Sequence, residues 1–120
     1  MICEKMTLWI RTSFVGFHKW DNAPDEVAYL RGRHRHTFNV RVGVDVTAGN
    51  DRELEFHMIK SQVNAIIDER LSALDDVGSC EMICKQIVAG LIDVYGNRTF
   101  VVETDEDGEC GAIFVSSQLS

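Results

Sequence analysis

Basic residues are scarce in this sequence, and long apolar runs are missing. The 120 residues include 12 Lys or Arg against 19 Asp or Glu, for a formal net charge of −7 at pH 7. General affinity for nucleic acids is not expected, because phosphate backbones attract basic surfaces. No stretch of about 18 apolar residues occurs, so the sequence predicts no membrane-spanning helix.

The first residues do not resemble a secretory leader, and the four cysteines form no C-x-x-C pair. Residues 1–7 carry charged side chains before any apolar run, unlike a signal peptide, so we expect a cytoplasmic protein with reduced thiols. Cys80 and Cys84 stand four residues apart, share one face of a helix, and are interpreted as small buried apolar side chains.

Alternating apolar residues predict the first strand. One face of residues 8–18 is apolar and ends in a histidine, its members being Leu8, Ile10, Phe14 and His18. The other face is apolar as well, so we expect this strand to be covered on both sides, by helices on one of them. In so short a chain, the second cover is interpreted as another subunit.

The second predicted strand carries two histidines at its start. Valines alternate with other residues over 37–46, and extending this register backward places His34 and His36 on the valine face. Imidazoles that open an apolar face need hydrogen bonds or a metal, because burying them without partners is costly. With His18 they make three imidazoles and no fourth protein ligand, which is the donor set of a catalytic zinc site.

The pattern of the whole chain predicts one α+β domain over residues 1–120. After the first strand we expect a long polar loop, then the second strand, two helices with Ser79 capping the second, and two strands joined by a turn. The loop is predicted at 19–33 and the two helices at 55–74 and 79–95. The third strand is predicted at 99–104, the turn at 105–108 and the last strand at 111–115. The order β-β-α-α-β-β predicts a four-stranded antiparallel sheet with two helices on one face.

Five short motifs resemble those of a known enzyme family, in the same order along the chain. Residues 14–18 resemble F-x-A-x-H, 34–38 resemble H-G-H-x-[YF], 54–60 resemble [VI]-x-D-F-x-x-L-K, 78–81 resemble P-T-S-E, and 102–104 resemble V-x-E-T. The chain is therefore similar to the 6-pyruvoyl-tetrahydropterin synthase and 6-carboxytetrahydropterin synthase family, over nearly its whole length. This resemblance implies the tunnelling fold.

The resemblance also implies an activity and an assembly. It implies a lyase that cleaves a carbon–oxygen bond in a pterin or purine-like nucleotide of the dihydroneopterin triphosphate class. Such enzymes serve pterin synthesis and the synthesis of 7-deazaguanine precursors, as in queuosine. The implied assembly is a homohexamer of two stacked trimers, in which sheets from three subunits close a barrel and the sites lie between subunits.

The residues implied by the resemblance form a metal set and a ligand set. His18, His34 and His36 are implied as ligands of Zn²⁺. Glu103 is implied as the carboxylate that anchors the amino and ring N–H groups of the pterin, and the remaining implied contacts are Glu81 and Thr104. A carboxylate suits this role because it accepts two parallel N–H donors at once.

Departures from the family pattern put the reaction in doubt. Residues 29–33 hold no thiol where the family carries a catalytic cysteine, and the histidine of the L-D-H motif is missing. Asp75 is one candidate for the retained aspartate, and Cys80, beside Glu81, is the one thiol near a motif residue. Losing one acid–base group typically slows a reaction about 10²–10⁴-fold. The alternatives are a catalytically inactive zinc-containing pterin- or nucleotide-binding homologue and a structural oligomer without metal.

Two charged segments complete the sequence-based expectations. Arg31, Arg33 and Arg35 alternate with the histidines and are interpreted either as a phosphate clamp, in which Arg35 contacts substrate, or as solvated or inter-subunit salt-bridging residues. Four acidic residues that follow Glu103 are interpreted as an exposed series; they are Asp105, Glu106, Asp107 and Glu109.

Overall fold

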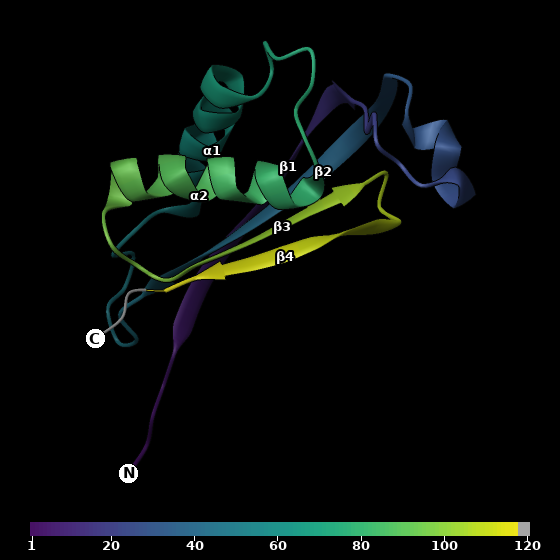
Figure 1. The fold of residues 1–120 in the computed structure, drawn as a ribbon. Coiled ribbons are helices and arrows are strands. Elements are labelled where there is room, and N and C mark those ends of the chain that lie inside the picture. Colours follow the sequence, from purple (N-terminus) through teal and green to yellow (C-terminus); the bar gives the residue numbers. More distant parts are fainter. Residues whose placement is uncertain (118–120) are drawn as a thin grey trace.

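The computed structural model describes residues 1–117 and confirms the predicted element order. Two long strands come first, then two helices, then a pair of shorter strands, as Figure 1 shows. The elements are β1 (Met6–His18), η1 (Asp25–Leu30), β2 (His34–Val46), α1 (Phe56–Arg70), α2 (Cys80–Tyr95), β3 (Phe100–Glu106) and β4 (Cys110–Ser116). The chain thus has the predicted α+β architecture.

The four strands form one antiparallel sheet in the order β1-β2-β3-β4. The register sets Phe14 opposite Phe38, and it sets His18 opposite His34 at the end of the β1–β2 pair. Both helices lie on the same face of this sheet (Figure 1). The end of β1, the start of β2 and the end of β3 therefore meet at one corner of the sheet.

The hydrophobic core fills the space between the sheet and the helices. Alternation in β2 turns Phe38, Val40, Val42 and Val44 toward the helices, where they are fully or almost fully buried. The apolar stripes of the helices pack against them, through residues that include Ile59, Val63, Ile83, Ile87 and Leu91. This packing fixes which side of each strand faces inward, and with it the side on which the histidines lie.

The opposite face of the sheet carries no helix within residues 1–117 (Figure 1). Apolar side chains on this open face remain in contact with solvent in the single chain; Trp9 is 54% exposed and Ile113 is 67% exposed. The Arg41 guanidinium stacks over the Trp9 ring, 4.7 Å from its centroid. The second cover predicted for β1 is therefore not supplied by residues 1–117.

Several element boundaries differ from the prediction, among them the end of the first helix and the end of β3. The first helix ends at Arg70, because the next residue, Leu71, leaves helical geometry with φ −127° and buries its side chain in the core. Strand β3 continues to Glu106, two residues beyond the predicted end, since Glu106 pairs with Phe38. The turn follows at residues 107–109, where Asp107 takes a positive φ of 57°.

No helix within residues 1–117 combines the length and the apolar character needed to cross a bilayer. The loop predicted over residues 19–33 is largely irregular, but it contains the short 3-10 helix η1. Its end is tied back near β1 by a backbone hydrogen bond of 2.8 Å from Trp20 to Leu30. The loop thereby borders the corner where the histidines lie.

Candidate metal centre

The structure brings His18, His34 and His36 together on the helix-facing side of the sheet. His18 ends β1 directly opposite His34, and His36 lies two residues along β2 on the same face. One ring nitrogen of each residue lies within 4.8 Å of the others, and the three rings stand edge-on to one another. The group can therefore hold one metal ion, as the sequence predicted.

Hydrogen bonds at Nδ1 orient all three imidazoles. Nδ1 of His18 lies 2.8 Å from the carbonyl oxygen of Gly78, and Nδ1 of His34 lies 2.7 Å from that of Gly32. A carbonyl oxygen only accepts, so in both rings Nδ1 carries the proton and the neutral ring keeps a lone pair on Nε2. Such backbone contacts are typical of histidines that bind a metal through the other nitrogen.

The Nε2 atoms of His34 and His36 are buried and have no hydrogen-bond partner among the described residues. Leaving a buried polar atom unsatisfied costs roughly 1–3 kcal/mol, so native proteins rarely do so without a reason. The Glu106 carboxylate, 3.5 Å from Nε2 of His36, is itself an acceptor. The residues therefore fit a cation bound by the Nε2 lone pairs.

Glu106 also reaches this cluster, against the prediction that it is an exposed acidic residue. Its Oε1 lies 3.4 Å from Nε2 of His18, and its Oε2 lies 3.5 Å from Nε2 of His36. Its side chain is 31% exposed. The alternation that places Val102 and Thr104 on the helix side holds for Glu106 too, so extending β3 by two residues would have found it.

Asp107 supports the site from behind His36, which the sequence reasoning also missed. Its Oδ2 lies 2.7 Å from Nδ1 of His36, and its Oδ1 accepts a hydrogen bond of 2.9 Å from the backbone N–H of Thr37. The hydrogen bond to His36 and the one from Thr37 hold the pKa of the Asp107 carboxyl below its ordinary value. A carboxylate in this position orients the imidazole and raises its basicity as a ligand.

A cavity of about 550 Å³ opens beside the histidines. The loop supplies Trp20 and Leu30 to its wall, and the start of α2 supplies Cys80 and Glu81. The structure thus places two predicted residues, Glu81 and Cys80, next to the metal cluster. Burial, reinforced by the negative charge of Glu106, raises the pKa of the Cys80 thiol to about 12, so this thiol stays protonated at neutral pH.

Asp75 and Arg35 lie away from this cavity. Asp75 is exposed and lines a neighbouring hollow with Lys19 and Arg33; its backbone carbonyl accepts a 3.3 Å hydrogen bond from Arg33 Nε. Arg35 is exposed on β2, opposite Phe17.

The other two arginines of the cluster are engaged within the chain. Arg31 lies 2.8 Å from Asp25 and also donates to the carbonyl of Ala23, while Arg33 stacks on Phe17 with 3.9 Å from Cζ to the ring centroid. Of these three arginines, only Arg35 has no such contact among the described residues, so it is the one available to bind a phosphate.

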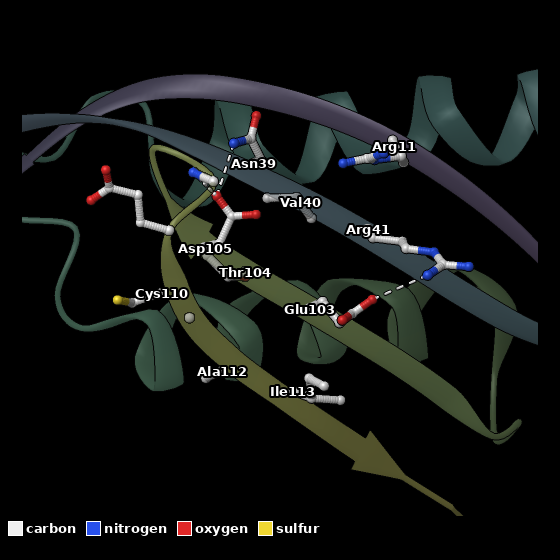
Figure 2. Close-up of a pocket in the computed structure, with 13 residues that line it drawn as sticks. Arg11, Asn39, Val40, Arg41, Glu103, Thr104, Asp105, Cys110, Ala112 and Ile113 are labelled. Carbon is white, nitrogen blue, oxygen red and sulfur yellow. Dashed lines mark hydrogen bonds and ion pairs between the residues drawn. The ribbon is translucent and has the colours of Figure 1, made fainter.

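Glu103 lies on the open face of the sheet, away from the histidines. It contacts Arg41, with 3.5 Å between Oε2 and Nη1, in a shallow cavity of about 360 Å³ that Arg11 and Asn39 also line (Figure 2). The next residue, Thr104, points the other way and is fully buried, accepting a hydrogen bond of 3.3 Å from the Cys84 thiol. Within one chain, the sheet separates Glu103 from the metal cluster.

No protein-family model and no curated protein matches this sequence.

Proposed function

We propose that this protein binds Zn²⁺ through Nε2 of His18, His34 and His36. The observation that carries the proposal is the pair of buried Nε2 atoms without partners, in rings already oriented through Nδ1. Imidazole donors suit zinc as well as copper and nickel, and zinc also binds carboxylate oxygen. The same three residues are the zinc ligands implied by the resemblance to the tetrahydropterin synthases.

We further propose that the ligand is a pterin or purine-like nucleotide of the dihydroneopterin triphosphate class. The five motifs support this ligand class. The cavity beside His18 is large enough for a bicyclic heterocycle and offers Trp20 as a flat apolar wall. Glu103 remains the proposed anchor for the heterocycle edge, and the exposed Arg35 is the proposed contact for its phosphates.

The proposed reaction is that of a carbon–oxygen lyase of the synthase type with altered acid–base groups. Bound zinc would polarise a carbonyl or hydroxyl oxygen of the ligand's side chain. The chain's own candidates for moving protons are Cys80 and Asp75. Cys80 lines the cavity as a protonated thiol, whereas Asp75 lines the neighbouring hollow. These placements favour the alternative, an inactive homologue that keeps the zinc and the ligand pocket.

We also propose that the chain assembles, with a hexamer of two trimers as the expected form. The apolar side chains of the open face support an assembly because water covers them in the single chain. Since the sheet separates Glu103 from the histidines of the same chain, a complete site would combine Glu103 of one subunit with the histidines of another.

Metal analysis tests the zinc proposal. Purified protein is expected to hold close to one zinc per chain by plasma mass spectrometry, and His34→Ala should remove most of it. His57→Ala is the matched control, because His57 is exposed at the start of α1 and far along the chain from the cluster. Less than about one-third zinc per chain in wild type, unchanged in His34→Ala, would show that the histidines do not form a zinc site.

Incubation with dihydroneopterin triphosphate separates the enzyme from the binding homologue. Chromatographic detection of a product that depends on His36 supports the lyase. Unchanged nucleotide, together with binding measured by calorimetry, supports the homologue. In either outcome the zinc content is measured on the same sample.

A further inference from the structure

We infer that Glu106 is a fourth protein ligand of the metal and closes the position that the three histidines leave open. This inference rests on the proposed zinc site. It goes beyond that site because a three-histidine set alone leaves a vacant coordination position for water or substrate. Here the same chain places the Glu106 carboxylate beside two of the three Nε2 atoms, those of His18 and His36.

The distances fit shared coordination better than a hydrogen bond. Metal–ligand distances of about 2.0–2.2 Å set neighbouring ligand atoms of a tetrahedral zinc site about 3.4 Å apart. Oε1 of Glu106 lies 3.4 Å from Nε2 of His18, and Oε2, the other oxygen of the same carboxylate, lies 3.5 Å from Nε2 of His36. An N–H···O hydrogen bond to a carboxylate is usually about 2.7–2.9 Å long. The pair formed by His36 Nδ1 and Asp107 Oδ2, at 2.7 Å, shows what such a bond looks like in this site.

The electrostatics of the neutral rings also favour a cation between these groups. His18 donates its Nδ1 proton to a backbone carbonyl, so the neutral ring presents only a lone pair toward Glu106. Two lone pairs and a carboxylate that converge on one point repel one another. A metal ion bound by all of them removes the repulsion and satisfies the buried Nε2 atom of His36.

The backbone holds Glu106 in this position. Its Cα is paired with Phe38 on β2 and with Cys110 on β4, so the residue belongs to two strand ladders rather than to the turn. The following N–H, that of Asp107, donates a 2.8 Å hydrogen bond to the carbonyl of Thr37. A ligand on such a rigid element reaches the metal without a loop movement.

The consequence concerns access to the metal. A zinc ion with four protein ligands is typical of closed sites, and a ligand oxygen would have to displace the Glu106 carboxylate before it could reach the metal. Glu106 is then either a permanent ligand, as in a protein that only binds zinc, or a ligand that the substrate displaces. Removing it should open a coordination position in both cases.

Zinc affinity and the spectrum of the cobalt-substituted protein test this assignment. In competition with a chromophoric chelator, Glu106→Ala should bind Zn²⁺ at least about 10-fold more weakly than wild type, since even residues that only support ligands are worth 10–100-fold. Glu106→Gln, which keeps the shape of the side chain, should weaken binding in the same direction. Glu109→Gln is the matched control, because it removes the same charge from an exposed residue of the adjoining turn and should leave affinity unchanged.

Azide provides a second readout on the Co²⁺ form. Because Glu106 fills the fourth position in wild type, azide should change the visible absorption of Glu106→Ala at a concentration that leaves the wild-type spectrum unchanged. If wild type and Glu106→Ala bind zinc with equal affinity and respond equally to azide, Glu106 is not a ligand. The three-histidine site would remain in that case. Failure of wild type to bind zinc at all would overturn the proposed function itself.

Discussion

Acidic residues near the end of β3 have different surroundings, although they look alike in sequence. Glu103 and Asp105 lie on the open face, where Asp105 accepts a 2.8 Å hydrogen bond from Asn39 (Figure 2). Glu106 lies on the helix side against the histidines, and Asp107 reaches His36 from a left-handed turn conformation. Successive side chains of a strand point to opposite faces of the sheet, so a shift of one position decides whether an acidic residue faces the histidines or the open face.

Another acidic residue, Glu53, is expected to make the stability of the fold depend on pH. Its Oε2 lies 2.6 Å from Nη1 of Arg98, and this contact, with further hydrogen bonds from Thr47 and Asn50, lowers the pKa of Glu53 from 4.5 to about 2. The folded state therefore favours the ionised carboxylate. The stabilisation is complete above pH 4.5 and is lost as the pH falls from 4.5 toward 2.

Urea unfolding of Glu53→Gln tests this dependence. At pH 7 the variant should unfold at a lower urea concentration than wild type, and the difference should shrink steadily between pH 5 and pH 3. Glu69→Gln, which changes an exposed residue of α1, serves as the control for net charge. A difference between Glu53→Gln and wild type that stays constant over this range would contradict the role of the Arg98 contact.

The close approach of the two helices depends on one small residue. Gly90 on α2 faces Ile66 on α1, and a Cβ built at Gly90 would lie 2.7 Å from both Cγ1 and Cγ2 of Ile66. Those two carbons are attached to the branch point of the side chain, so a rotation cannot move both away. The glycine therefore sets the distance between the helices, and with it the seat of α2 on the sheet.

Gly90→Ala should destabilise the protein even though alanine favours helices. The gain in helix propensity is about 0.5–1 kcal/mol, whereas overpacking of a filled core typically costs about 1–3 kcal/mol. Thermal unfolding should show a lower midpoint for Gly90→Ala. The double variant Gly90→Ala/Ile66→Ala should lose less stability than the sum of the two single variants, because removing Ile66 makes room for the new methyl group. A higher unfolding midpoint in Gly90→Ala would show that Ile66 and the helices make room for the new methyl group without a loss of stability.

The two faces of the sheet differ: the helices cover one face, and the other is exposed to solvent in the single chain. The helix side of the sheet is a filled core, while the open side exposes apolar residues around a pocket that contains Glu103. The histidines and Glu106 belong to one chain, so the proposed metal site needs no partner. The proposed ligand site needs both sides of the sheet and therefore a neighbouring subunit.

Ile113→Glu separates these two requirements. The side chain is 67% exposed on β4, and a charge there should prevent the apolar open faces from packing together, so sedimentation should find a smaller mass than for wild type. Zinc content should remain close to one per chain, while affinity for a pterin, measured by calorimetry, should fall at least about 10-fold. Glu103→Ala should lose pterin affinity with unchanged mass and zinc. An Ile113→Glu monomer with full pterin affinity would contradict a site shared between subunits.

The fold could be predicted from the sequence because its periodicities are unambiguous. The valine alternation of β2, extended backward, placed His34 and His36 correctly, and the helical stripe beginning after Ser79 placed α2. Ser79 caps that helix as predicted, accepting a 3.2 Å hydrogen bond from the N–H of Met82. Element ends were less predictable, since the end of β3 depends on pairing with β2 and not on local composition.

The sequence by itself determined the α+β architecture and the three-histidine cluster, because hydrophobic periodicity assigns each side chain to a face. Only the tertiary structure decided which carboxylates serve that cluster. Glu106 joins it and Asp107 supports it, while Glu103 lies across the sheet and Asp75 beside a separate hollow. The physical reason is that faces follow from local alternation, whereas the distance between a strand end and another strand depends on register across the sheet.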